Sequence, residues 1–380
     1  MCKFLLPTTC ITLLILIVAC SPVKNLKKAN VVSLRLVSQY NLPNNTLFKN
    51  TVVGGLSGID YDAANNTYYI ISDDRSNLSA ARYYTAAITI GNNVIDTVII
   101  NGVHTLLQQN GQAYPNNKVN AALTPDPENI RLHTPTGLLY WNSEGERIVT
   151  AKDTILNNPS ICIIKKDGSF IDSLPLPSQL VMHASKKGPR QNGVLEGSTF
   201  NQASTVFFTN VEEPLYEDGP RADTLPNKAF IRIFSFDIER KKNTAQYAYE
   251  LDAVAYPPNP NNAFMVNGVP DILWESDSSL LVVERSFSTG RQPCTIKIFR
   301  ANFANATNVI SVAALANENT FTPMKKQLLI NLDKENRYID NIEGITWGPI
   351  LPNGKRSIVA VADNNFSPLQ QQQFLLFEVK

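Results

Sequence analysis

Five segments of the chain repeat one pattern, and this repeat restricts the possible folds more than any other feature. Each segment begins with a short β-rich run, turns, and continues into an apolar run that ends in an acidic residue. The first residues are Ser57, Glu128, Glu196, Pro270 and Glu343, which lie 71, 68, 74 and 73 residues apart. The terminal acids are Asp73, Glu144, Glu212, Glu284 and Asp363. A fixed period of β units is typical of propellers and other repeat arrays.

Each unit also contains two further strand candidates, such as Phe230–Phe236 and Gln246–Leu251 in the third. Four antiparallel strands make one blade, so the sequence predicts an all-β fold, a single β-propeller of five four-stranded blades. A sixth blade hidden in a long loop is the alternative. The fifth unit ends at Phe374–Glu378, and we expect Val32–Val37 to add its outer strand and close the ring. Helix signals are few, and Val309–Ala316 is the best candidate.

The N-terminus has the pattern of a bacterial lipoprotein signal. Lys3 precedes the apolar run Ile11–Ala19, and Cys20 follows it directly. The run is too short for a helix that spans the hydrocarbon core of a bilayer. The sequence therefore predicts a signal peptide over residues 1–20 and lipidation of Cys20. The alternative is a plain secretory signal in which the cysteine has no role.

The residue after the cysteine is Ser21 rather than aspartate, which favours the outer membrane of the bacterial cell envelope. Residues 21–30 are expected to be a polar tether and residues 31–380 the propeller domain. We expect contact with the membrane only through the lipid anchor. The two cysteines left in the mature chain, Cys162 and Cys294, fall in non-adjacent units, so no disulfide is predicted.

The chain has almost no net charge, with 34 basic and 33 acidic residues. A neutral chain has no electrostatic reason to bind nucleic acid, so nucleic-acid partners are excluded. We expect a monomer whose partner is a small molecule.

The predicted fold brings the acidic residues together. In a blade the first strand lines the channel and the second runs antiparallel beside it, so first residues and terminal acids meet at one channel mouth. The candidate metal ligands are Asp73, Glu128, Glu144, Glu212, Glu284 and Asp363. Their oxygens favour a hard divalent cation, with Ca²⁺ expected before Mg²⁺. The alternative is that these acids cap strand ends and bond backbone N–H groups between blades.

Other residues complete the predicted site. Glu196 and Glu343 are the candidate general bases, and Arg75, Arg190 and Arg285 are the candidates for binding an anionic group of the substrate. The chain contains no G-x-S-x-G sequence, which disfavours a serine triad. Its three histidines, His104, His133 and His183, have no metal-ligand spacing, and we expect them in loops or on the surface.

Several motifs resemble a known family, the phytase-like domain described as having esterase-like activity. The similar segments, within residues 50–380, are Gly54–Asp62, Ile71–Arg75, Arg190–Gly197, Ile342–Ile345 and Ala362–Phe366. Asn129 departs from the pattern, because a glycine is expected after the acid that opens the second unit. The resemblance implies a secreted hydrolase of esters or phosphate esters.

These observations favour a lipid-anchored, metal-assisted hydrolase of esters or phosphate esters. A Ca²⁺-dependent lactonase is a second enzymatic reading. A binding propeller without catalytic activity, in which the acids only connect the blades, is the alternative from a different class.

Overall fold

Twenty-four strands and very little helix make up the described part of the chain. The computed structural model describes Met1, residues 30–318 and residues 320–380. The signal peptide predicted over residues 1–20 and nearly all of the tether predicted over residues 21–30 lie outside the described residues, apart from Met1 and Asn30. Within the described residues, no helix is long and apolar enough to cross a membrane.

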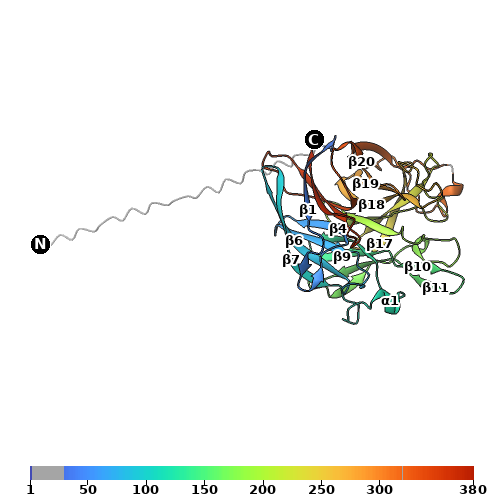
Figure 1. Ribbon diagram of the computed structural model, residues 1–380, viewed down its shortest axis with the longest axis horizontal. Helices are drawn as coiled ribbons and strands as arrows, with labels where there is room; N and C mark the ends of the chain where they lie inside the picture. The colour runs from blue at the N-terminus through green and yellow to red at the C-terminus, as the bar shows by residue number, and fades with distance from the viewer. Residues whose placement is uncertain (2–29, 319) are drawn as a thin grey trace. The chain divides into compact units, whose positions relative to one another are not determined.

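Five antiparallel four-stranded sheets make up the fold (Figure 1), which confirms the predicted five-bladed propeller. The first contains β4 (Leu56–Asp62), β5 (Thr67–Ser72), β6 (Arg82–Gly91) and β7 (Val94–Thr105). The second contains β8 (Pro127–His133), β9 (Leu138–Ser143), β12 (Ser160–Ile164) and β13 (Phe170–Ser173). The third contains β14 (Leu195–Phe200), β15 (Val206–Val211), β16 (Phe230–Asp237) and β17 (Lys242–Glu250).

The fourth sheet contains β18 (Met265–Ser276), β19 (Ser279–Ser288), β20 (Thr295–Asn302) and β21 (Lys325–Asn331). The fifth contains β22 (Asn341–Trp347), β23 (Ser357–Asp363), β24 (Gln372–Val379) and, as its outer strand, β1 (Leu34–Leu42). Two small hairpins lie outside the sheets, β2 (Leu47–Phe48) with β3 (Thr51–Val52) and β10 (Glu146–Val149) with β11 (Thr154–Asn157).

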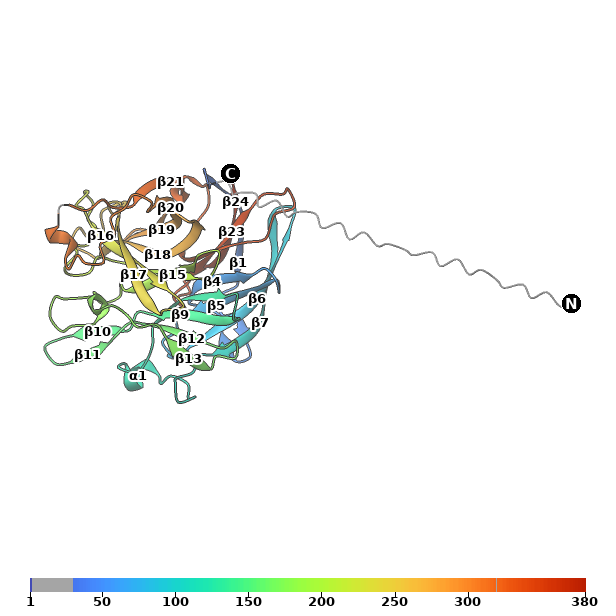
Figure 2. The same ribbon diagram turned by 180° about the vertical axis from the view of Figure 1, so that it is seen from behind.

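The ring closes as predicted, through the N-terminal strand. β1 pairs antiparallel with β24, and Leu34 lies opposite Val379 while Leu42 lies opposite Gln372. Figure 2 shows β1, β23 and β24 side by side. Because β1 pairs with β24, the edge of β24 is covered and β1 becomes the outer strand of the fifth sheet.

Among the described residues, helical structure is limited to α1 (Asn117–Asn120) and three 3₁₀ turns, η1 (Ser178–Leu180), η2 (Leu315–Asn317) and η3 (Leu332–Lys334). The prediction of a helix at Val309–Ala316 was wrong. That segment is irregular, and only its last two residues belong to a helical turn. It lies against the outer edge of the third sheet, where the amide of Val309 donates to the carbonyl of Gln246.

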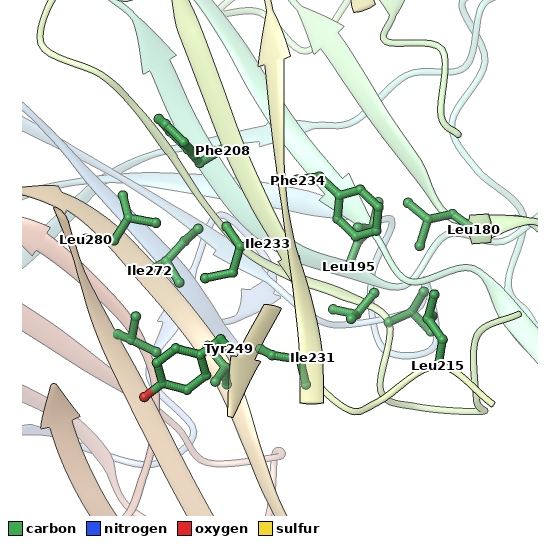
Figure 3. Close-up of a cluster of buried hydrophobic side chains, with 14 of the residues drawn as sticks. Leu180, Leu195, Phe208, Leu215, Ile231, Ile233, Phe234, Tyr249, Ile272 and Leu280 are labelled. Atoms are coloured by element: carbon green, nitrogen blue, oxygen red, sulfur yellow. The ribbon is translucent and has the colours of Figure 1, made fainter. Parts of the chain in front are cut away.

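Apolar side chains fill the space between adjacent sheets. Figure 3 shows Phe208 and Ile233 of the third sheet next to Ile272 and Leu280 of the fourth, and all four are buried. The alternating apolar residues of the strands thus form the contacts between blades, as expected for sheets buried on both faces.

The five inner strands, β4, β8, β14, β18 and β22, contact one another in a closed order around the centre. Each contains a β-bulge near its first residues. The breaks in register fall between Leu56 and Ile59, Pro127 and Asn129, Leu195 and Ser198, Gly268 and Asp271, and Ile342 and Gly344. The first residue of every repeat unit therefore lies in a bulge, and a bulge re-aims side chains.

Glycine follows the first residue in three units because the inner strands approach closely there. A Cβ at Gly58 would lie 2.6 Å from the Cα of Asn129, and one at Gly197 would lie 2.6 Å from the Cα of Asp271. Side chains cannot fit at such distances. In these three units the bulge directs the side chain of the first residue, and the glycine that follows allows the close contact between inner strands.

Candidate functional site

The edge of the ring where each inner strand begins and each second strand ends is called the mouth here. The structure brings eight carboxyl groups together at this mouth, and each interacts electrostatically with others of the set. They are Asp73, Asp126, Glu128, Glu144, Glu196, Glu212, Glu343 and Asp363, and are called the acidic cluster. Seven of them are among the residues that the sequence analysis proposed.

Three members of the acidic cluster lie close enough to share one ion. One carboxylate oxygen each from Asp126, Glu128 and Glu144 lie within 4.8 Å of one another. Glu128 lies in the bulge of β8, and Asp126 precedes this strand by one residue. The amide of Glu144 donates to the carbonyl of Asp126 over 3.0 Å, which fixes the two residues side by side. The three oxygens suit a hard divalent cation, so the residues fit the expected cofactor class.

Asp126 was missed by the sequence analysis because it precedes the repeat unit. A signal was present, since Asp126-Pro127-Glu128 places two acids around a proline at the start of a strand. Proline is tolerated at the first residue of a strand, where it donates no ladder hydrogen bond.

Burial and crowding keep several of these carboxyl groups protonated near neutral pH. Burial, followed by the charge of Asp126, raises the pKa of Glu144 to about 8. Burial also raises the pKa of Glu343 to about 8, although Arg285 opposes the shift. The pKa of Asp126 rises to about 7 and that of Asp363 to about 6, mainly through burial. So many charges cannot coexist in a buried site, so these carboxyl groups either stay protonated or are compensated by a cation.

The pKa values of three further members shift in the same direction. Burial raises the pKa of Glu128 and Glu196 well above the usual range, and neighbouring acids add to the shift. Asp73 behaves likewise, with burial and the charge of Asp363 raising its pKa. The effect is collective for five members, because the charges of neighbouring members raise the pKa of Asp73, Glu128, Glu144, Glu196 and Glu343.

Arg285 and Arg75 are the positive charges at the mouth. Arg285 bridges two blades, with Nη2 2.5 Å from Glu212 Oε1 and Nη1 2.8 Å from Glu343 Oε1. Arg75 lies 2.6 Å from Glu146 and 3.5 Å from Asp126. Two arginines facing eight acids leave the acidic cluster with an excess of carboxyl groups.

The structure does not bring Glu284 or Arg190 to this cluster. Glu284 is buried and accepts hydrogen bonds from Tyr249, Asp252, Asn267 and Lys326, at 2.7 to 3.0 Å. Its neighbour Arg285 faces the mouth instead, because successive residues of a strand point to opposite faces. Glu284 thus connects the strands of two blades.

Arg190 holds a loop in place. Its Nε donates to the carbonyl of Pro214 over 2.8 Å and its Nη2 to the carbonyl of Gly219 over 2.7 Å, while the guanidinium lies over the ring of Tyr216. Burial lowers its pKa, and the charges of Arg221 and Arg147 act in the same direction.

The histidines take no part in the acidic cluster. The expectation of a loop or surface position was wrong for His133, which is buried at the end of β8 away from the mouth. Its two ring nitrogens lie 2.7 Å from the hydroxyl of Thr136 and 2.9 Å from the carbonyl of Ser204. Cys162 and Cys294 are unpaired, the first buried and the second partly exposed.

Arg131 blocks the centre of the ring below the mouth. Its Nη2 lies 2.8 and 2.7 Å from the two carboxylate oxygens of Asp271, and its Nε is 2.5 Å from the carbonyl of Ser198. Its Nη1 donates to the carbonyls of Ile59 and Ile345. One buried side chain of the second sheet thus contacts the other four sheets, which leaves the mouth as the access side of the acidic cluster.

Fold and site together define a five-bladed propeller with an acidic mouth. The chain belongs to the phytase-like family described as "esterase-like activity of phytase", whose model matches residues 51–366. No curated protein matches the sequence.

Among solved structures, a gluconolactonase from Xanthomonas campestris is 10% identical with a TM-score of 0.35, covering 92% of this chain and 91% of the other. A GH43_12 protein from a capybara gut metagenome is 11% identical with a TM-score of 0.42, covering 91% and 56%. A Thermus thermophilus protein described as a glucose dehydrogenase is 12% identical with a TM-score of 0.32, covering 86% and 85%. At these values the similarity says nothing about activity.

Proposed function

We propose that this protein is a metal-assisted hydrolase of esters or phosphate esters that acts at the acidic mouth. The observation that carries the proposal is the triad of Asp126, Glu128 and Glu144, whose carboxylate oxygens lie within 4.8 Å of one another. Carboxylates are not gathered in a buried site without compensation, and the two nearby arginines do not balance them.

The triad would hold the cation, and Ca²⁺ suits a site of carboxylate oxygens with room for further ligands. A bound cation would polarise the ester oxygen and lower the pKa of a water. Asp73 interacts electrostatically with Glu128, Glu212 with Glu144, and Asp363 with Asp73, so their charge would strengthen cation binding. Glu284 is left out of the proposed ligand set because its carboxylate is already bonded by four groups.

Glu196 and Glu343 are the proposed proton acceptors. Each lies in the bulge of an inner strand, which directs its side chain to the mouth, and each interacts electrostatically with the cluster. Glu343 is also held by Asn341, whose Nδ2 donates to its Oε1 over 2.7 Å. Arg285 would orient the substrate, since its Nε bonds to no described residue. Arg75, next to Asp126, is the second candidate for that task.

A binding propeller without catalytic activity is the second candidate. Two contacts favour it, because Glu144 accepts from the amide of Val194 over 2.5 Å and Glu212 pairs with Arg285. Both acids therefore already connect neighbouring blades.

Anchoring through a lipid on Cys20, in the outer membrane, remains part of the proposal. The amide of Val31 donates to Glu275 Oε1 over 2.5 Å, near the end of β18 and thus at the edge opposite the mouth. The propeller domain therefore begins at the edge opposite the mouth. Replacing Cys20 by alanine should release the protein from membranes, and an unchanged membrane fraction with normal processing would contradict the anchor.

The function is tested by metal analysis combined with hydrolysis assays. The purified protein is assayed on p-nitrophenyl acetate and p-nitrophenyl phosphate with Ca²⁺ and with EDTA. We expect hydrolysis that chelation abolishes and that Asp126→Asn weakens strongly. Asp277→Asn, in the turn between β18 and β19 at the opposite edge, is the matched control. No bound metal and no activity on either ester would favour the binding propeller.

A further inference from the structure

A cavity of about 470 Å³ lies at the mouth between the fourth and fifth sheets. Its lining includes Arg285, Phe287, Gln292, Tyr338, Asn365 and Gln370. Its size is within the usual range of small-molecule sites. Two residues of the lining, Arg285 and Asn341, bond to Glu343 of the acidic cluster. A molecule in the cavity would therefore lie beside a proposed proton acceptor.

The cavity offers hydrogen-bonding groups that the protein itself leaves unused. The Nε of Arg285 is buried and bonds to no described residue, and the side chain of Gln292 lies exposed at the cavity. The side chain of Gln370 makes one long contact of 3.4 Å, to Asp340. Amide groups both donate and accept, as a hydroxyl group does.

Most charges around the cavity are paired, and Arg291, a second arginine of the lining, lies 4.0 Å from Asp333 and over the ring of Tyr256. Arg285 contacts Glu212 and Glu343, and Asp340 accepts from the amides of Asn341 and Gln371 over 2.9 and 2.7 Å. The acidic cluster lies on the adjoining side. A polyanion would meet Arg291 but also the carboxylates of the adjoining acidic cluster, which outnumber it, so its binding is disfavoured.

Two rings, Phe287 and Tyr338, contribute flat apolar surface among these amides. Rings beside amide groups suit a molecule that has both hydroxyl groups and C–H faces. We infer that the cavity binds the uncharged, hydroxyl-rich part of the substrate, so that the preferred substrate is an acylated sugar or polyol rather than a phosphate ester. This inference rests on the proposed function and narrows it.

The reaction implied is simple hydrolysis. The bond between the acyl carbon and the sugar oxygen breaks, the hydroxyl of water goes to the acyl carbon, and the sugar oxygen takes a proton. The products are a carboxylic acid and the free sugar, and no redox partner is required.

The test compares two acetates that differ in their hydroxyl groups, methyl 6-O-acetyl-glucoside and ethyl acetate, together with glucose 6-phosphate. We expect kcat/KM at least tenfold higher for the sugar acetate than for ethyl acetate, and lower still for the phosphate. Gln292→Leu and Gln370→Leu should each lower the ratio of the two acetates roughly tenfold, the effect of losing about one hydrogen bond. The control is Gln327→Leu on the exposed outer strand β21, which should keep the ratio.

Equal kcat/KM for the two acetates, or preference for glucose 6-phosphate, would overturn the inference while leaving the hydrolase intact. If no ester is hydrolysed, the proposed function fails, and the cavity is then tested by binding alone. Saturation-transfer NMR with methyl glucoside should give a signal that Gln292→Leu reduces and Gln327→Leu does not. Absence of the signal in the unaltered protein would also overturn the inference.

Discussion

Asn129 Nδ2 donates a hydrogen bond to Asp271 Oδ1 over 3.0 Å, from the second inner strand to the fourth. These two residues occupy the positions that Gly58, Gly197 and Gly344 fill in the other three units. The residue that departs from the family pattern is therefore one of a pair. Where the strands do not need glycine for a close approach, the side chains meet across the centre and, with Arg131, close it.

Arg131, which fills the centre of the ring, should be essential for the stability of the fold. Arg131→Met would leave Asp271 buried without its partner, and several carbonyls without a donor. We expect a loss of about 3–5 kcal/mol in the free energy of unfolding, measured by urea denaturation. The control is Arg35→Met, whose side chain is half exposed in its pair with Glu378 and should change stability by less than about 1 kcal/mol. Similar effects of the two substitutions would show that Arg131 does not connect the sheets.

Stability without metal should fall as the pH rises. The pKa of Asp363 is raised to about 6, that of Asp126 to about 7 and that of Glu144 to about 8, mainly by burial. An acid with a raised pKa binds more protons in the folded state, so its stabilisation is present below its unfolded pKa and is lost as the pH rises through the folded value. Thermal melts in EDTA should therefore shift to lower temperature between pH 5 and 8.

Calcium should reverse this trend, because deprotonated carboxylates bind the cation and protonated ones do not. The increase in melting temperature caused by Ca²⁺ should therefore grow from pH 5 to 8. A melting temperature in EDTA that is constant or rises over this range would contradict the crowding of the acids.

Replacing Glu196 or Glu284 by glutamine should change the stability of the metal-free protein in opposite directions. Glu196→Gln removes a carboxyl group from a crowded buried site, so stability without metal should stay level or rise at neutral pH while Ca²⁺ affinity falls. Glu284→Gln removes the charge that Tyr249, Asn267 and Lys326 bond, and should cost about 1–3 kcal/mol with or without metal. Melts of both variants in EDTA compare them directly. A clear loss for Glu196→Gln would favour the acids as blade connectors.

The effect of Glu343→Gln on stability without metal should lie between the effects of Glu196→Gln and Glu284→Gln. It relieves repulsion but also weakens the ion pair with Arg285, over 2.8 Å. We expect a small change in stability without metal, together with lower Ca²⁺ affinity and lower hydrolytic activity.

The ring should depend on its closing strand. Deletion of residues 32–37 removes the first half of β1 and exposes the edge of β24, so the domain should lose its cooperative thermal transition. Deletion of residues 21–29, which precede the ring, is the control and should leave the transition unchanged. An unaltered melt after the first deletion would show that the ring does not need β1.

The repeat was sufficient to predict the blades, because β alternation and turn residues recur at a period that the chain itself displays. The prediction that the N-terminal strand pairs with Phe374–Glu378 was also correct, because the repeat showed that the fifth unit lacks its outer strand. The acids at the mouth could also be predicted from the sequence, since the position of an acid in one repeat unit implies the same position in the next. The fourth unit is the exception. Glu284 continues the pattern, but the register places Arg285 opposite Gly268 at the mouth.

A shift of one residue along a strand reverses the face to which a side chain points, and no local signal fixes that register. Asp126 was missed because it lies outside the repeat, although it is held beside Glu144 by a backbone hydrogen bond. The sequence around Arg131 is that of an ordinary strand with a polar residue. Only the central position of Arg131 in the ring brings the carbonyls of other sheets within hydrogen-bonding distance.

The sequence by itself determined the class of fold, the five repeat units, the closing strand and most of the acids at the mouth, because these follow from periodicity and from chain order. That no sixth blade is present was decided by the structure of the described residues. The tertiary structure alone decided which acids share one ion, which arginine faces them, what closes the centre and where a cavity opens. Those relations join residues up to 214 positions apart, such as Arg131 and Ile345. They depend on how five sheets pack around one axis, a geometry that no single segment encodes.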